Sequence, residues 1–116
     1  MKFEKLEVWK LSIQFSTDIY KLTSSFPSNE LYGLTSQLRR ASTSISLNIA
    51  EGSGRTTDTE FARFLDISVG SALECVSALH ICLNLQLISK EQFQTHYQSA
   101  ETICKKLYSL KNYLKS

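Results

Sequence analysis

Apolar side chains recur every three or four positions along most of this chain, and this spacing is the feature that most restricts its fold. Between residues 31 and 49 they stand at Leu31, Leu34, Leu38, Ala41, Ile45 and Ile49. Such spacing places side chains on one face of an α-helix. One proline and four glycines in 116 residues leave few points where helices must break. The pattern predicts an all-α fold built from long helices.

The apolar spacing divides the chain into four predicted helices. The first lies within residues 3–24 and ends before Pro27, because the residue preceding a proline avoids the α-helical region. The second starts within residues 28–36, where Gly33 weakens the first turn. It ends at Gly52, which can adopt the left-handed conformation of a helix cap.

Capping boxes mark the starts of the last two helices. In the segment from Thr57 to Glu60, the threonine hydroxyl caps a backbone N–H and the glutamate reaches back to the cap. This box opens a helix that runs to about Leu87, and the segment from Ser89 to Gln92 opens the fourth. Four such helices with short connections predict an antiparallel up-down-up-down four-helix bundle, as a single domain over residues 1–116.

The composition is that of an ordinary globular protein. Hydrophobic residues make up 42% and charged residues 21%, and the net charge of +2 is too small to identify a partner. No apolar run approaches the roughly 20 residues that span a bilayer, so we expect no membrane partner. The N-terminal residues lack a signal-peptide pattern, and three cysteines, an odd number, favour a reducing compartment. We therefore expect a cytoplasmic protein.

Residues with metal-binding or catalytic chemistry form no recognisable pattern. Cys75, Cys82 and Cys104 lack the short spacing of structural zinc sites, so we interpret them as core residues. His80 and His96 are interpreted as surface or helix-edge residues. No glycine-rich phosphate loop joins a strand to a helix, and no Ser–His–Asp arrangement is suggested. We expect no metal, no cofactor and no enzymatic activity.

Small residues gather on the second and third predicted helices. They are Ser42, Thr43, Ser44 and Ser46 on the second and Ser68, Gly70, Ser71, Ala72 and Ala78 on the third. Serine and threonine are indifferent helix formers, and a glycine inside a helix costs about 1 kcal/mol relative to alanine. Packing must therefore favour these residues. We expect the two helices to cross closely along them, with a seam between subunits as the alternative.

Arginines and lysines are segregated along the chain. All the arginines lie between residues 39 and 63, whereas lysines gather near the C-terminal end. Arginine forms planar bidentate pairs with carboxylate or phosphate, whereas lysine acts as a point charge. The candidate nucleic-acid-binding residues are Arg39, Arg40, Arg55, Arg63, Lys105, Lys106 and Lys111.

The alternative role for the arginines is internal ion pairing. If the second and third helices pack through their small residues, Glu74 comes close to the polar face of the second helix. A partly buried glutamate there needs a partner such as Arg40. The polar network predicted in this way consists of Gln37, Arg40, Asn48, Glu51 and Glu74.

Two long stretches, "FPSNELYGLTSQLRRASTSISLNIAEGSGR" and "EFARFLDISVGSALE", carry a specific motif. They closely resemble the four-helix-bundle proteins encoded within intervening sequences of bacterial 23S ribosomal RNA genes, and the resemblance covers nearly the whole chain. The motif positions are Gln37, Arg40, Asn48, Glu51, Gly52, Gly70, Ser71 and Glu74.

The resemblance implies a bundle that assembles as a homopentamer with a central channel. A related branch, the accessory variability determinant of diversity-generating retroelements, binds nucleic acid and a reverse transcriptase. Two hypotheses follow. One is an oligomeric module that contacts structured RNA or DNA through its arginines and C-terminal lysines. The other is a structural or protein-interaction scaffold, such as a reverse-transcriptase accessory subunit, whose arginines form internal pairs.

Overall fold

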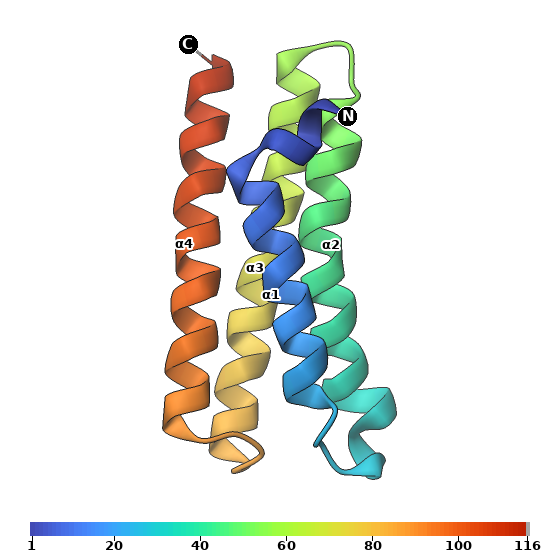
Figure 1. Cartoon of the computed structure of the whole chain (residues 1–116), viewed down its shortest axis with the longest axis vertical. Helices are drawn as coiled ribbons and strands as arrows, with labels where there is room; N and C mark the ends of the chain where they lie inside the picture. The colour runs from blue at the N-terminus through green and yellow to red at the C-terminus, as the bar shows by residue number, and fades with distance from the viewer. Residues whose placement is uncertain (116) are drawn as a thin grey trace.

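Four long helices form a bundle in the computed structural model, which describes residues 1–115. In chain order they are α1 (Glu7–Thr23), α2 (Ser36–Ser53), α3 (Asp58–Asn84) and α4 (Lys90–Lys115). Successive helices run in opposite directions, so that α1 begins and α4 ends at the same end of the bundle (Figure 1). The predicted all-α, antiparallel up-down-up-down bundle is confirmed over the described residues. Ser116, the last residue of the predicted domain, lies outside them.

A short 3₁₀-helix, η1 (Lys2–Lys5), precedes α1, so the first long helix does not begin at residue 3. Leu6 separates the two segments because its backbone is extended, with φ −69° and ψ 125°. Phe3 packs edge-on against Trp9, with ring centroids 5.2 Å apart. The apolar spacing continues across the break because Leu6 and Trp9 both pack against the core.

The connection from α1 to α2 is helical but irregular. It contains a 3₁₀ turn and a π turn, η2 (Ser28–Glu30) and η3 (Leu31–Thr35). Gly33 leaves the helical region there, with φ −108° and ψ −113°. The Glu30 carboxylate accepts a hydrogen bond from the backbone N–H of Leu34 at 3.2 Å. Regular α2 therefore starts only at Ser36, the later limit set by the sequence.

The end of α2 differs from the prediction. Gly52 lies inside the helix, which continues to Ser53 and is capped by Gly54 with φ −88°. No glycine in the described part of the chain has a positive φ, so the predicted left-handed cap at Gly52 is wrong. Packing requires this glycine instead. A Cβ atom at Gly52 would lie 2.6 Å from the Cβ of Phe64 in α3, so a larger residue cannot fit without a helix shift.

Serine side chains link α2 to α3 along the same seam. Ser68 donates a hydrogen bond to the Ile45 carbonyl and Ser71 donates one to the Ser44 hydroxyl, each at 2.9 Å. Both donors are buried, and the helices cross closely here. Gly70 does not take part. It is exposed, and no atom of another described segment lies within 4 Å of a Cβ built on it. Gly70 therefore has no packing role within the described residues of one chain, and a contact between subunits stays a prediction.

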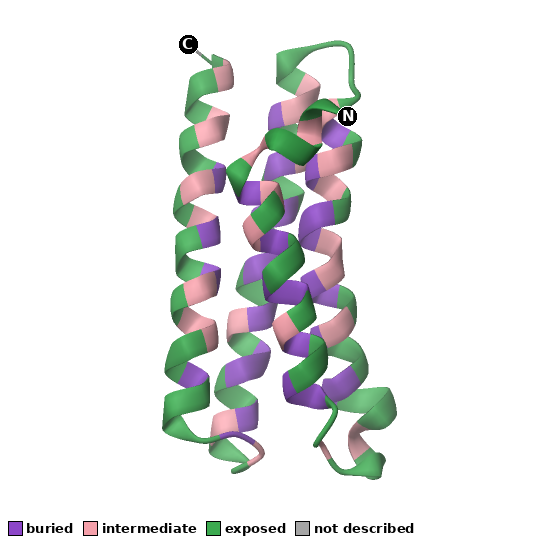
Figure 2. Ribbon diagram, viewed as in Figure 1, coloured by how far each residue is buried: buried purple, intermediate pink, exposed green. Residues whose placement is uncertain are grey.

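Buried residues occur along all four helices (Figure 2), and the apolar ones among them pack into one core. The largest of those almost fully buried include Phe15, Ile19, Leu38, Ile45, Leu65, Leu79, Ile103 and Leu107. Cys75 and Cys82 are buried beside them as free thiols, and Cys104 is partly buried. Burial raises the pKa of Cys75 to about 12 and that of Cys82 to about 11. Both behave as inert core thiols rather than reactive ones.

Both predicted capping boxes lie at helix starts. The Thr57 hydroxyl accepts a hydrogen bond from the Glu60 backbone N–H at 3.2 Å, which opens α3. At α4 the exchange is reciprocal: the Ser89 N–H donates to the Gln92 side chain at 2.9 Å, and the Gln92 N–H donates to the Ser89 hydroxyl at 3.0 Å. These local bonds fix where the long helices begin.

Helix α3 ends in a left-handed turn and stops before the predicted limit. Gln86 has φ 61°, and the Leu87 N–H donates to the Cys82 carbonyl at 2.9 Å, as in a Schellman motif. By length and composition alone, α3 is apolar enough to cross a membrane. In this bundle it packs against both α2 and α4, and 44% of its apolar 18-residue window is buried, whereas Ile67, Leu73 and Ile81 remain exposed.

Candidate nucleic-acid interface

The arginines, close together in sequence, are divided between the two ends of the bundle. Helix α2 contains 18 residues, which span about 27 Å at about 1.5 Å per residue. Arg39 and Arg40 lie near its start, whereas Arg55 follows its end and Arg63 lies early in α3. We call the end with the α1–α2 connection the first end and the end with the α2–α3 connection the second end. They are the lower and upper ends in Figure 1.

A groove at the first end contains Arg39 and Arg40. It has a volume of about 490 Å³ and is lined by Tyr20, Leu31, Tyr32, Thr35, Ser36, Arg39, Arg40 and Thr43. We call it the tyrosine–arginine groove. No acidic residue is among these lining residues, so the groove presents two guanidinium groups without a compensating carboxylate. Such a surface attracts anions.

Arg39 clamps α2 to α1. Its Nε donates a hydrogen bond to the Thr23 hydroxyl at 2.8 Å, and its Nη2 donates to the Tyr20 carbonyl at 3.3 Å. Its guanidinium also lies over the Tyr20 ring, 4.6 Å from the centroid. A guanidinium has five N–H donors, so this clamp leaves donors available to a ligand. Arg39 is therefore both a structural residue and a candidate phosphate contact.

Arg40 is the freer of the two groove arginines. Its side chain is exposed, and no described residue forms an ion pair or side-chain hydrogen bond with its guanidinium. Tyr32, on the same groove, is 94% exposed. Arginine beside exposed tyrosine is a combination that suits nucleic acid, because phosphates pair with the cation and bases stack on the ring.

Cations at the second end are largely matched by acids. Arg55 pairs with Glu51 at 3.0 Å and lies 4.6 Å from the centroid of the Phe64 ring. Lys111 pairs with Asp66 at 2.6 Å. A cleft of about 420 Å³ between α3 and α4 is lined by Asp58, Thr59, Ala62, Arg63, Asp66, Lys111, Leu114 and Lys115. This α3/α4 cleft is mixed in charge and suits an anion less well than the tyrosine–arginine groove.

The remaining candidate cations differ in their partners. Lys106 pairs with Glu7 at 2.7 Å, linking α4 to α1, and its hydrogen bond and charge lower the pKa of that carboxyl. Arg63 and Lys105 are exposed, and within residues 1–115 neither has a side-chain partner. The candidate nucleic-acid residues therefore do not form one continuous surface on a single chain.

The predicted polar network does not form within one chain. Asn48 donates to the carbonyl and the hydroxyl of Ser44, at 2.8 and 3.0 Å, and Glu51 pairs with Arg55 instead. The other three members, Gln37, Arg40 and Glu74, are exposed. No ion pair among the described residues joins Arg40 to Glu74. The network does not form because serine–serine contacts fill the seam between α2 and α3, so the longer side chains remain outside it.

Arg40 and Glu74 nevertheless lie at the same level of the bundle. Ser44 and Ser71 meet across the antiparallel α2/α3 seam. Arg40 precedes Ser44 by about one helical turn, and Glu74 follows Ser71 by about one turn, so both are displaced in the same direction. Both are exposed. This side of the bundle therefore carries an arginine and a glutamate that one chain leaves unpaired.

The two tyrosines of the groove are not among the residues predicted from the sequence. Tyr20 fits the helical apolar spacing of residues 3–24, yet it is 44% exposed. Tyr32 falls between Leu31 and Leu34 and does not fit the apolar step of its helix. The position of Tyr32 outside the apolar spacing was the one sequence signal that it faces solvent. Its place at the groove depends on the kink at Gly33, which helical periodicity does not predict.

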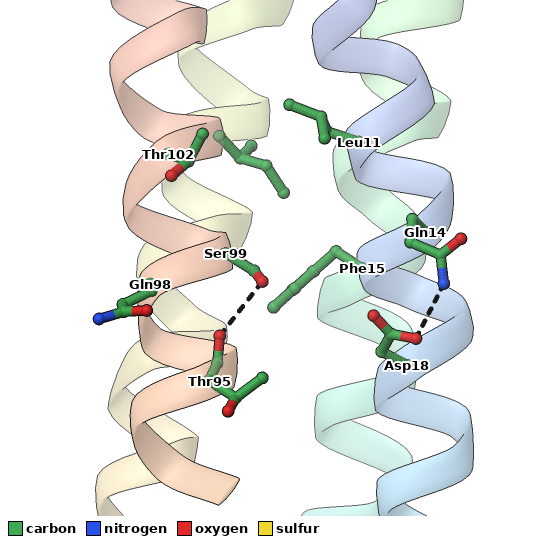
Figure 3. Close-up of a pocket in the computed structure, with 9 residues that line it drawn as sticks. Leu11, Gln14, Phe15, Asp18, Thr95, Gln98, Ser99 and Thr102 are labelled. Atoms are coloured by element: carbon green, nitrogen blue, oxygen red, sulfur yellow. Dashed lines mark hydrogen bonds between the residues drawn. The ribbon is translucent and has the colours of Figure 1, made fainter. Parts of the chain in front are cut away.

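A second groove, between α1 and α4, is polar but lacks cations. Its volume is about 350 Å³, and Figure 3 shows its side chains. Asp18 is its one ionisable lining residue within the described chain and accepts a hydrogen bond from Gln14 at 2.9 Å. Ser99 donates to the Thr95 carbonyl at 3.2 Å. A groove with a carboxylate and no cation does not favour phosphate. No group of three metal-ligating side chains occurs in residues 1–115.

Comparison with known proteins gives one family and one fold. A family model described as "23S rRNA-intervening sequence protein" matches residues 4–109. Among curated proteins, none matches the chain. The matching solved structures include the crystal structure of a protein with unknown function, from the S23 ribosomal protein family, from Bacteroides thetaiotaomicron VPI-5482. It shares 25% sequence identity with a TM-score of 0.81, covering 90% of this chain and 97% of that one.

Proposed function

Because the chain belongs to the 23S rRNA-intervening sequence protein family, we propose that it is a non-catalytic accessory protein that binds the backbone of structured RNA or DNA. We further propose that it works as a homo-oligomer in the bacterial cytoplasm, without a membrane partner. The tyrosine–arginine groove carries this proposal. Its two guanidinium groups face no carboxylate among the lining residues, and phosphate is an anion that arginine recognises with matched geometry.

Salt dependence tests the nucleic-acid proposal. Fluorescence anisotropy with ribosomal RNA fragments and duplex DNA, at about 50 and 200 mM salt, measures the slope of log K against log salt. Because each phosphate contact releases counterions, affinity should fall steeply as salt rises. Absence of binding at about 50 mM salt, where the electrostatic contribution is largest, contradicts the proposal.

Variants locate the contacts. Replacing Arg40, Arg63 and Lys105, the candidate cations without side-chain partners among the described residues, by alanine should weaken binding and flatten the salt slope by about three contacts. The matched control changes three lysines outside the candidate set, Lys2, Lys21 and Lys90. It removes the same net charge. If the control weakens binding as much as the test variant, binding is diffuse and the assigned residues are wrong.

Two unlike exposed surfaces support the oligomer proposal. A mainly apolar groove of about 530 Å³ between α1 and α2 is lined by Ile13, Ser16, Thr17, Tyr20, Thr43, Ser46 and Leu47. Helix α3 exposes Ile67 and Ile81, 46% and 48% accessible. When one surface of a copy contacts a different surface of the next, the contact is head-to-tail, and it forms a ring when the rotation between successive copies closes. A homopentamer is such a ring.

Light scattering at micromolar concentration tests assembly, and a monomer there contradicts it. Leu47→Glu and Ile67→Glu should each dissociate the assembly, since each places a charge in an apolar contact. Leu85→Glu is the control, because Leu85 is also exposed, at 56%, and lies at neither surface. Dissociation by Leu85→Glu alone contradicts the assigned interface.

One observation favours a second candidate, a scaffold whose arginines serve ion pairs, such as an accessory subunit of a reverse transcriptase. Arg40 and Glu74 have no ion-pair partner among the described residues and lie at the same level of the bundle, so they suit pairing between copies. Two variants distinguish the scaffold from the nucleic-acid module: Arg40→Glu alone, and the charge swap that combines it with Glu74→Arg. A scaffold loses assembly with Arg40→Glu and regains it in the double variant. A nucleic-acid module loses binding with Arg40→Glu and regains none.

A further inference from the structure

We propose that the tyrosine–arginine groove binds unpaired nucleotides of a single strand, with Tyr32 and the Tyr20–Arg39 stack as base platforms and Arg40 as the phosphate contact. This inference rests on the proposed nucleic-acid function and narrows its ligand to strands whose bases are not stacked in a duplex. It differs from backbone binding alone because the bases themselves contribute affinity.

Tyr32 is the first platform. Its side chain is 94% exposed, the most exposed tyrosine among the described residues. It lies in the irregular turn η3, one residue before the non-helical Gly33, and so falls outside the apolar face that packs on the core. A tyrosine side chain has only two torsion angles, so its flat ring at the rim of a groove has little conformational entropy to lose on stacking.

Tyr20 and Arg39 form the second platform, which is already assembled. The guanidinium lies 4.6 Å from the ring centroid, and the bond from Arg39 to the Thr23 hydroxyl at 2.8 Å fixes its plane. Bases stack on guanidinium planes as they do on aromatic rings. Because the free protein already holds this stack, a ligand does not have to order it.

The charge and size of the groove fit a nucleotide. Its volume of about 490 Å³ lies within the usual range of small-ligand sites, about 300–1,000 Å³. Two arginines line it without an acidic neighbour among the lining residues. Arg40 has no side-chain partner in the described chain to compete with a phosphate.

The aromatic residues favour a single strand over a duplex. In a duplex the faces of the bases are stacked on one another, so a tyrosine ring reaches them only after the helix opens. Unpaired bases in loops and ends expose these faces, and aromatic rings and arginine planes are the groups that bind them. An acidic peptide pairs with the same arginines but gains nothing from base stacking.

An abasic strand separates stacking from charge. We suggest anisotropy with an unstructured RNA of about 12 nucleotides, within the usual site size of single-strand binders, and with an abasic strand of equal length. The intact strand should bind at least about fivefold more tightly, from stacking of at least one base. Tyr32→Ala should reduce this difference to the contribution of the Tyr20–Arg39 stack, and Tyr32→Phe should retain it. Tyr108→Ala, at a tyrosine 48% exposed on α4, is the control.

A stacked probe gives a second readout. A 2-aminopurine in the strand should be quenched by the wild type and by Tyr32→Phe, and more weakly by Tyr32→Ala, in which only the Tyr20–Arg39 stack remains. Equal affinity for the intact and abasic strands, or an acidic peptide that binds as tightly as the intact strand, overturns the stacking inference. Backbone binding survives the first result, since the abasic strand still binds. If neither strand binds, the proposed nucleic-acid function fails as well.

Discussion

Both ends of the bundle carry cations, but in different surroundings. At the first end, Arg39 and Arg40 line a groove with tyrosines and no acid. At the second end, the cations line a cleft with Asp58 and Asp66, and Lys111 is bound to Asp66. The same residue types therefore yield an anion-attracting surface at one end and a nearly neutral one at the other.

The ends also differ in what fixes their geometry. The second end depends on close backbone approach, because Gly52 lets α2 lie against Phe64 of α3. The first end depends on a polar clamp, because Arg39 joins α2 to Thr23 and Tyr20 of α1. At the second end, where close packing fixes the geometry, the cations pair with neighbouring acids. At the first end, the clamp holds Arg39 beside an open groove.

The largest effect should come from the packing of the second end. Gly52→Ala places a Cβ 2.6 Å from that of Phe64, and we expect a loss of stability of about 1–3 kcal/mol from overpacking. The control is Gly70→Ala, at an exposed helical position with no such contact. It should stabilise by about 0.5–1 kcal/mol. Urea denaturation measures both, and equal effects would refute the packing role of Gly52.

The clamp of the first end should have the next largest effect. Arg39→Ala removes a charged hydrogen bond to Thr23 and the contact with the Tyr20 ring, and should cost about 1–2 kcal/mol in unfolding free energy. Arg39→Lys keeps the charge but not the planar fork, and should recover only part of this. Full recovery by lysine means that charge alone, and not the clamp, stabilises this end.

These first two predictions show what the sequence could establish. Apolar spacing and capping boxes locate the helices because both signals are local, and Thr57 and Ser89 cap them as expected. The Arg39 clamp is not local, since its partner Thr23 lies on another helix. The roles of Gly52 and Gly70 depend on how α3 rotates against α2. Two helical glycines look alike in sequence, and only one of them faces a neighbouring helix.

For the candidate binding residues too, local features could be predicted from the sequence and contacts between helices could not. Arginines between residues 39 and 63 read as one cluster, but α2 places about 20 Å of helix between Arg40, in its second turn, and its end at Ser53, beyond which Arg55 lies. Exposure of Arg40 and Glu74 could not be predicted either, because serine–serine contacts displace longer side chains from the seam. The sequence therefore predicts the right residue types but not which of them act together.

Nucleic-acid affinity should distinguish the ends directly. Arg40→Ala should weaken binding to a ribosomal RNA fragment about three- to tenfold and lower the salt slope by about one contact. Lys111→Ala should change affinity less than about twofold, because Asp66 already neutralises this lysine. Anisotropy titration of both variants provides the measurement. A larger loss for Lys111→Ala than for Arg40→Ala reverses the comparison and moves the interface to the second end.

Removing an acid should make the second end resemble the first. Asp66→Asn releases Lys111, whose pairing with a half-exposed carboxylate contributes about 0.2–1 kcal/mol. Stability should fall by no more than this amount, and RNA affinity should rise. Glu101→Gln, at an exposed acid on α4, is the control for the change in net charge. If both variants raise affinity equally, the gain reflects net charge and not a cation released at the second end.

The smallest effect should come from pH at the first end, where His96 lies beside Asp18 and Lys21. Burial lowers the pKa of His96, and the charge of Asp18 offsets this only in part. A histidine whose pKa is lower in the folded protein takes up a proton more readily in the unfolded chain, so acid favours unfolding. Its contribution to stability is therefore complete above the unfolded pKa of about 6.5 and is lost as the pH falls from there through the folded pKa. Urea midpoints between pH 7.5 and 5 should show a shallow decline that His96→Gln removes, because glutamine takes up no proton. Asp18→Asn should steepen the decline, because it removes the charge that favours protonated His96. An unchanged slope in His96→Gln assigns the decline to other groups.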